Sequence, residues 1–218
     1  MKNKKTRYHF VLDKSGSMHN CRDSTIQGFN QQLETIRGLQ IEFPDQEFTV
    51  SLTTFDEEIE WVFKQTCIQS FEKLTPKMYV PGGCTALLDA IGTSINKIRQ
   101  TSESEIVNDE MSVVMIILTD GMENASREFD YHQIARMIKM LEQTEKWTFT
   151  FLGADIDAFH TSKMLNIRKE NVMAFNKEDM GQVMQEISEG MVAYSKSKYF
   201  GKTKKNFLDG IHRKDRRS

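Results

Sequence analysis

The chain has 218 residues, of which 39% are hydrophobic and 28% charged, and its formal net charge is -2. This composition excludes a disordered or collagen-like chain, and the length suits one α/β domain with a single core. The first seven residues are polar and basic, and the apolar run after them, 8–13, is too short for a signal-peptide core or a membrane span. Three cysteines, Cys21, Cys67 and Cys84, leave one thiol unpaired and lack metal-ligand spacing. We therefore expect a cytoplasmic protein with no membrane contact.

Charge is distributed unevenly along the chain. Residues 196–218 contain nine Lys or Arg and two Asp or Glu, a net +7, which leaves -9 for residues 1–195. We expect a folded domain over 1–195 and a basic C-terminal tail over 196–218. Because its cations are interleaved with Tyr199, Phe200 and Phe207, the tail has three open interpretations: contact with nucleic acid or an acidic partner, a solvated segment, or a segment that folds back onto the acidic body.

The first half of the chain shows strand and helix patterns in turn. Residues 8–13 form an apolar run that predicts a buried strand, and apolar residues at three- and four-residue spacing predict a helix over 22–41. Alternating patterns over 48–53 and 59–63 predict a hairpin with an edge strand, whose acidic turn we expect to be solvated. Residues 64–84 are irregular and predict a loop over the sheet.

The second half continues this alternation. Helix patterns occupy 87–98, 134–141, 159–165 and 180–191, and strand patterns occupy 113–118, 147–152 and 172–175. The polar stretch 101–110 predicts a connection, and the six apolar residues at 113–118 are typical of a central strand buried on both faces. Alternating strands and helices predict a doubly wound, Rossmann-like α/β fold, with a mainly parallel sheet, helices on both faces and one antiparallel edge strand.

Oxygen-bearing side chains follow or flank these elements at three separate places. Asp13, Ser15 and Ser17 lie in D-K-S-G-S-M, Thr85 lies in G-C-T-A-L-L-D-A-I, and Asp120 follows the central strand in L-T-D-G. Ligand sites of parallel sheets form beyond the carboxyl ends of the strands, where these loops would meet. Hydroxyls and two carboxylates suit a hard cation, so we predict a Mg²⁺ site, with Mn²⁺ or Ca²⁺ as alternatives. The first loop alone could instead be a helix cap.

The three segments together resemble the metal-ion-dependent adhesion site of von Willebrand factor type A domains, in the family's order and over nearly the whole of 1–195. The resemblance implies that Ser15, Ser17 and Thr85 offer hydroxyl oxygens to the cation, and that Asp13 and Asp120 act directly or through water. Gly16 would let the loop turn tightly. In adhesive members the metal accepts a Glu or Asp from a partner protein. The bare domain looks more like intracellular, prokaryotic or phage-type members, so we expect an interaction module that helps assemble an intracellular complex.

Two alternative functions are an enzyme that uses the same cation and a factor that binds nucleic acid. A metal-assisted hydrolase or phosphatase would need a general base near the cation, for which only His19 is close in sequence, so we do not expect an enzyme. A factor that binds nucleic acid through the tail is a further alternative. We expect Cys84 to be a packing residue rather than a nucleophile. The polar residues 124–128 either line a binding rim or form an ordinary polar loop.

Overall fold

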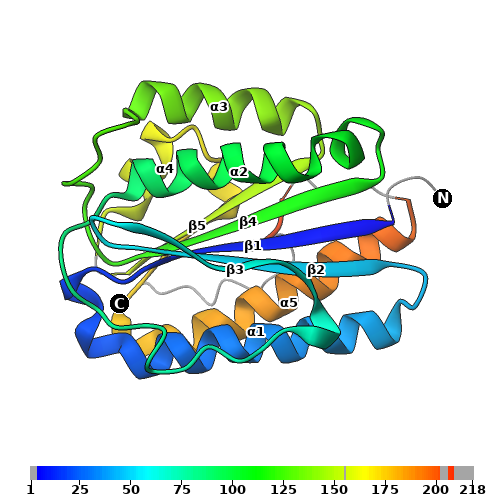
Figure 1. The fold of residues 1–218 in the computed structure, drawn as a ribbon, viewed down its shortest axis with the longest axis horizontal. Helices are drawn as coiled ribbons and strands as arrows, with labels where there is room; N and C mark the ends of the chain where they lie inside the picture. Colours follow the sequence, from blue (N-terminus) through cyan, green and yellow to red (C-terminus); the bar gives the residue numbers. More distant parts are fainter. Residues whose placement is uncertain (1–3, 155, 202–205, 209–218) are drawn as a thin grey trace.

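The computed structural model describes residues 4–154, 156–201 and 206–208. The strands form one sheet in the order β3-β2-β1-β4-β5-β6 (Figure 1). Their bounds are β1 (Lys5–Asp13), β2 (Glu47–Phe55), β3 (Ile59–Cys67), β4 (Met111–Thr119), β5 (Trp147–Ala154) and β6 (Val172–Phe175). All neighbouring pairs are parallel except β2 and β3. The predicted sheet with an antiparallel edge strand is therefore confirmed.

Helices cover both faces of the sheet (Figure 1). One face carries α1 (Arg22–Glu42) and α5 (Met180–Tyr199), and the other carries α2 (Leu87–Val107), α3 (Tyr131–Gln143) and α4 (Ala158–Met164). Short 3-10 turns, η1 (Gly16–Cys21), η2 (Ile68–Ser70), η3 (Lys169–Asn171) and η4 (Lys177–Asp179), lie between them. Among the described residues, none of the helices is both long and apolar enough to cross a membrane.

Each face of the sheet has its own apolar cluster. Under α1 and α5 the cluster includes Phe29, Leu33 and Met184, and under α2 and α3 it includes Ile91 and Ile134. Every residue of β4 is buried, as expected for a central strand with helices on both sides. The methionines of α5, Met180, Met184 and Met191, are buried core residues.

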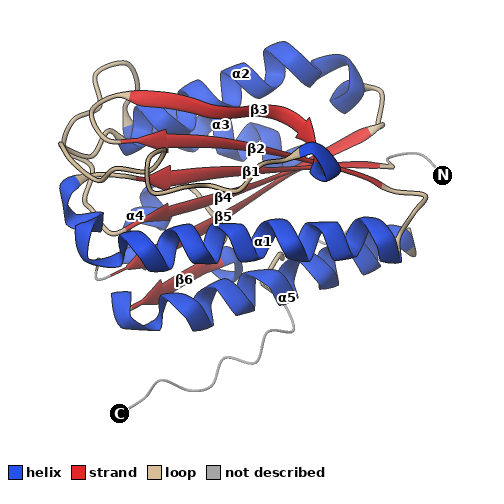
Figure 2. Ribbon diagram, turned by 60° about the horizontal axis from the view of Figure 1, so that its bottom comes forward, coloured by secondary structure: helices blue, strands red, loops and turns tan. Residues whose placement is uncertain are grey.

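The strand order reverses between β1 and β4. The chain runs outward from β1 to β2 and β3, then returns through α2 to place β4 on the other side of β1. The two neighbours are in register, with Leu12 opposite Leu118, so Asp13 and Thr119 end the two strands side by side. The loops that follow these strands lie at the same end of the sheet (Figure 2). Such a reversal point is where open parallel sheets bind ligands.

Two sequence predictions need correction. Residues 64–67 belong to β3 and 68–70 to η2, so the irregular segment begins later than expected. The stretch 101–110 is helical as far as Val107, because Ser102 and Ile106 continue the buried stripe of Ile98 at four-residue spacing. Ser102 is polar but buried, and its hydroxyl accepts a hydrogen bond from the Arg7 guanidinium at 3.1 Å. A buried hydrogen bond thus allows a serine at a core position where the helix pattern predicts an apolar residue.

The boundary expected between 195 and 196 falls inside α5, which continues to Tyr199. Lys198 donates hydrogen bonds to the carbonyl of Lys5 and to the Thr6 hydroxyl, at the start of β1. Phe207 has no exposed surface and packs beside Tyr194, with ring centroids 6.1 Å apart and the ring planes tilted by 46°. Part of the basic tail is therefore docked on the domain. Most of its lysines and arginines lie in 202–205 and 209–218, outside the described residues, so nucleic-acid binding through the tail stays a prediction.

Candidate metal centre

The loop after β1 turns its polar groups toward one another. Asp13 Oδ1 accepts the backbone N–H of Ser15 at 2.7 Å, and the Ser15 and Ser17 hydroxyl oxygens are 3.1 Å apart. Ser15 precedes η1 but makes no side-chain capping hydrogen bond, so the helix-cap interpretation does not describe this loop. Gly16 has an ordinary negative φ, and a Cβ there would meet only the Gly83 carbonyl, at 3.5 Å. Backbone strain therefore does not require a glycine at position 16.

Asp120 joins this loop to the end of β4. Its Oδ1 accepts the Ser17 hydroxyl at 2.5 Å, across 103 residues of sequence. Thr119, at the end of β4, donates its hydroxyl to Asp13 Oδ2 at 2.5 Å. The hydroxyl proton of Ser17 thus points at a carboxylate, so its oxygen can offer a lone pair to a cation. The Thr119 hydroxyl also accepts the Gly121 N–H at 3.1 Å and therefore orients Asp13.

Thr85 lies directly beside these groups. A Cβ placed on Gly121 would be 2.6 Å from Thr85 Oγ1 and 3.5 Å from Asp13 Oδ2, so both oxygens face the Gly121 backbone. The Thr85 backbone is fixed by Asn124, whose side-chain oxygen accepts the Thr85 N–H at 2.8 Å and whose own N–H donates to the Thr85 carbonyl at 3.0 Å. All five predicted residues therefore converge at the reversal point of the sheet.

The polar loop 124–128 holds the backbone around the centre in place, and a role of its exposed side chains in a binding rim stays a prediction. Besides the Asn124 bonds, the Asp89 carboxylate on α2 accepts the backbone N–H groups of Arg127, Glu128 and Phe129 at 2.7, 2.9 and 2.8 Å. These bonds tie the loop after β4 to the first turn of α2, which follows Thr85. The position of Thr85 relative to Asp120 is thus set by a hydrogen-bonded loop.

The hairpin turn also contacts the loops of the centre, while Glu57 and Glu58 are exposed, as expected for a solvated acidic turn. Asp56 forms an ion pair with Lys14 of the first loop. The Glu57 carboxylate accepts the N–H of Cys84 at 2.6 Å. Cys84 itself is exposed, so it is not the buried packing residue that we expected.

Burial dominates the electrostatics of Asp13. Removal from water, the largest cause, and the neighbouring Asp120 charge both raise the pKa of its carboxyl group, and the net result of all its contacts is a pKa of about 6. Hydrogen bonds from Thr119 and Ser15 lower the pKa and only partly offset burial. A buried carboxylate at this position is therefore costly without a compensating positive charge.

The donor set fits a divalent cation of hard type. Asp120 Oδ2 is fully buried, and no described group donates a well-aligned hydrogen bond to it; the Lys177 ammonium, 2.7 Å away, makes a charge contact. Within the described residues no cluster of three or more His, Cys, Asp or Glu is placed to hold a metal, so any cation here depends on hydroxyl oxygens. Ser17 is exposed, so an outside ligand can reach the position. Oxygen-only ligation with an open side suits Mg²⁺ or Mn²⁺.

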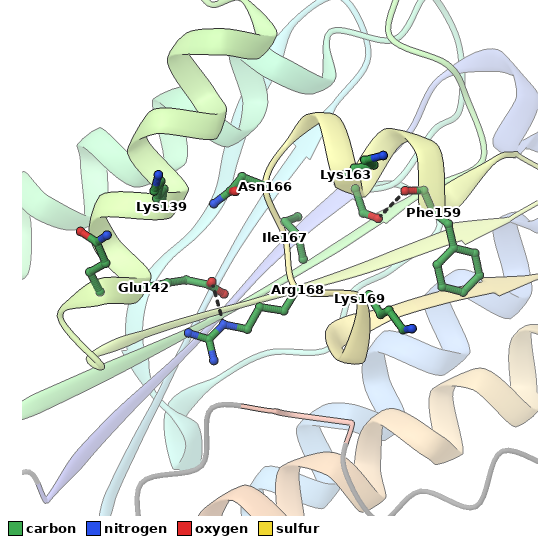
Figure 3. A pocket seen from close by; sticks show the side chains of 10 residues that line it. Lys139, Glu142, Phe159, Lys163, Asn166, Ile167, Arg168 and Lys169 are labelled. Carbon is green, nitrogen blue, oxygen red and sulfur yellow. Dashed lines mark hydrogen bonds and ion pairs between the residues drawn. The ribbon is translucent and has the colours of Figure 1, made fainter.

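A separate cavity of about 550 Å³ lies between α3 on one side and α4 with the segment that follows it on the other (Figure 3). Arg168 reaches toward Glu142 there, with 3.1 Å between the guanidinium Nε and the carboxylate oxygen. Lys139 and Lys163 also line this cavity. None of its lining residues belongs to the metal centre.

Three groups that shape the centre were not expected there: Thr119, Asp89 and Lys177. Asn124 was expected only as part of the polar loop 124–128. Thr119 lies inside the L-T-D-G motif and Asn124 follows it closely, so their closeness to Asp120 in sequence was a usable signal. Asp89 follows Thr85 by one helical turn, in the first turn of α2. Lys177 comes from η4, 160 residues after Ser17, whose carbonyl it contacts at 3.2 Å, and no local pattern marks it.

Comparison with known proteins gives one family. The profile of the von Willebrand factor type A domain matches residues 9–190. A comparison with curated proteins found no match.

Solved structures with this fold come from varied sources. The vWF domain of the type V pili tip protein Mfa5 from Porphyromonas gingivalis has 10% identity and a TM-score of 0.61, over 88% of this chain and 97% of that one. Manganese-loaded Plasmodium vivax TRAP protein has 16% identity and a TM-score of 0.56, over 84% and 73%. Proximal thread matrix protein 1 from the mussel byssus, with a zinc-occupied MIDAS motif, has 16% identity and a TM-score of 0.53, over 86% and 46%.

The chain thus spans less than half the length of some of these proteins, 45% for another crystal form of the mussel protein. At such identities the structural likeness shows the fold, and the profile match shows the family. Together with the strand order and the converging loops, these findings establish that the chain belongs to the von Willebrand factor type A domain family.

Proposed function

We propose that this protein is a metal-dependent interaction module, in which Mg²⁺ held by Asp13, Ser15, Ser17, Thr85 and Asp120 recruits an acidic side chain of a partner protein. One observation carries the proposal: two buried carboxylates and three hydroxyls from distant loops meet at the reversal point of the sheet. The relatives described as manganese-loaded and zinc-occupied support a divalent cation in this family.

The chemistry of the donors favours a carboxylate as the incoming ligand. Two aspartates balance the charge of a divalent cation formally, and neutral hydroxyls add no further negative charge. The cation therefore stays electrophilic toward an anionic oxygen from outside. Because a single metal–carboxylate bond is a small contact, surrounding surface must contribute, and a specific interface buries on the order of 1,200–2,000 Å².

In this proposal the centre binds and does not catalyse. His19, the histidine nearest to the first loop in sequence, is exposed and makes no hydrogen bond to the centre within the described residues. A cytoplasmic setting, in which the module assembles an intracellular complex, is part of the proposal. It is supported by the three free thiols of Cys21, Cys67 and Cys84.

Affinity capture with the full chain tests this function. The bait is wild type, Asp13→Ala or Asp23→Ala, each in Mg²⁺ and in EDTA; Asp23 is an exposed aspartate in the first turn of α1 and serves as the matched control. We expect wild type and Asp23→Ala to capture a partner protein in Mg²⁺ and not in EDTA. We expect Asp13→Ala not to capture it in either condition. Equal capture in EDTA, or by Asp13→Ala, would show that the metal does not bridge the two proteins.

A further inference from the structure

A lysine from the far end of the chain contacts the metal centre. Lys177 lies in η4, between β6 and α5, and its ammonium is 2.7 Å from Asp120 Oδ2 and 3.2 Å from the Ser17 carbonyl oxygen. The Asp120 side chain has no exposed surface, whereas 21% of the Lys177 side chain is exposed. The pair is therefore a nearly buried ion pair at the position where a metal ligand is predicted.

Both oxygens of Asp120 are engaged in this arrangement. The Ser17 hydroxyl donates to Oδ1 at 2.5 Å, and Lys177 lies against Oδ2. Lys14, a cation of the first loop, is paired with Asp56, and its ammonium lies 3.7 Å from the Glu60 carboxylate. Lys177 is thus the lysine that balances Asp120 without a metal, and a buried carboxylate deprived of such a partner is strongly destabilising.

A divalent cation bound at Asp120 would lie within a few ångströms of this ammonium. Charges of +2 and +1 at about 5 Å repel enough, even at the dielectric constant of water, to change a binding constant by about tenfold or more. Added salt weakens but does not remove this repulsion, because the pair is mostly shielded from solvent. The same lysine that stabilises the metal-free centre therefore opposes metal binding.

We propose that Lys177 is an internal competitor of the divalent cation: it neutralises Asp120 in the metal-free protein and lowers the affinity of the centre for metal. This inference rests on the proposed metal site. The proposed role of Lys177 has two consequences. The domain stays folded without metal, and the occupancy of the metal site follows the metal concentration. Metal affinity in this chain is set by a residue outside the five-residue motif.

Metal titration of the full chain tests the inference. Lys177→Met removes the charge and keeps most of the apolar stem, and Lys177→Gln is a second variant with a polar end. Lys169→Met is the matched control, because Lys169 is exposed on η3 and has no ion-pair partner among the described residues. Calorimetric titration with Mg²⁺ and Mn²⁺ should show about tenfold or greater tightening in both Lys177 variants. The control should bind like wild type.

Thermal unfolding gives a readout independent of affinity. In EDTA, Lys177→Met should unfold at a lower temperature than wild type, because Asp120 loses its counter-charge. In saturating Mg²⁺ the difference should shrink or reverse, since the cation takes over that role. A variant that is equally destabilised in EDTA and in Mg²⁺ would show a purely structural contact and overturn the inference.

The outcomes separate this inference from the proposed function. If wild type and Lys177→Met bind metal with equal affinity, or the variant binds more weakly, competition is refuted while the metal site stands. If only the variant binds, competition is supported and a metal bridge in the wild type is refuted. If neither binds at millimolar metal, both proposals fail.

Discussion

Gly121 occupies a position at which a single methyl group would press on the metal centre. A Cβ there would lie 2.6 Å from Thr85 Oγ1 and 3.3 Å from Thr85 Cγ2. Gly121 does not have a positive φ, so alanine causes no backbone strain and the effect of Gly121→Ala is steric. A separation of 2.6 Å is shorter than any ordinary contact, so the Thr85 hydroxyl must move.

The surroundings determine how Thr85 can respond. Its N–H and carbonyl are held by Asn124, and the Ala125 N–H also donates to the carbonyl at 3.2 Å. With the backbone fixed, a β-branched side chain relieves the clash mainly by rotating about χ1, which turns the hydroxyl out of the centre. We expect an overpacking cost of about 1–3 kcal/mol in unfolding free energy. A misplaced ligand should weaken metal binding by about 10- to 100-fold.

The assay combines urea unfolding in EDTA with calorimetric titration of Mn²⁺ and Mg²⁺. Gly82→Ala is the matched control, because a Cβ at position 82, in the loop that leads to Thr85, would meet nothing within 4 Å. Gly82→Ala should change neither quantity appreciably. If Gly121→Ala binds metal as tightly as Gly82→Ala, Thr85 is not a ligand and the reasoning is refuted.

Three further predictions concern the fold around the centre. Burial and the Arg7 charge hold the pKa of His9 well below its usual value, so only the unfolded chain gains this proton as pH falls below about 6.5. The unfolding free energy, measured in urea, should therefore fall more steeply in wild type than in His9→Gln as pH drops from 6.5 to 5.5, by up to about 1.4 kcal/mol per pH unit. Equal slopes of unfolding free energy against pH in the two proteins would contradict this. Asp89→Asn removes a charged acceptor from three backbone N–H groups and should lower the unfolding free energy by about 1–3 kcal/mol, with faster amide exchange at 127–129. Unchanged exchange would show that the Asp89 carboxylate does not hold this loop. Phe207→Ala should cost about 3 kcal/mol or more in urea unfolding, whereas Phe200→Ala, with the ring 72% exposed, should cost little; equal costs would argue against a docked tail.

The fold was largely predictable because the apolar patterns are strong. The six-residue run of β4 and the stripes of α1 and α5 record burial directly in the sequence. The extension of α2 to Val107 was missed, since Ser102 fills a core position by accepting a hydrogen bond from buried Arg7. A pattern of apolar residues cannot register a contact that depends on a strand 95 residues away in sequence.

The centre was predictable where its chemistry is concentrated in short motifs. Asp13 ends β1 and Asp120 directly follows the neighbouring strand β4, so topology alone brings them together. The supporting contacts were not predictable in the same way. Lys177 reaches Asp120 only because β6 returns the chain to the same edge of the sheet, and the anchoring of Phe207 is hidden in a basic, polar segment.

The most direct test of the central claim is a crystal structure of the full chain grown in Mn²⁺, with anomalous scattering used to locate the metal. The account predicts one strong anomalous peak among the hydroxyls of Ser15, Ser17 and Thr85, beside Asp13 and Asp120, with an open coordination position facing solvent. Absence of a peak there at saturating Mn²⁺, or a peak held by other residues, would contradict the claim that these five residues form a metal centre.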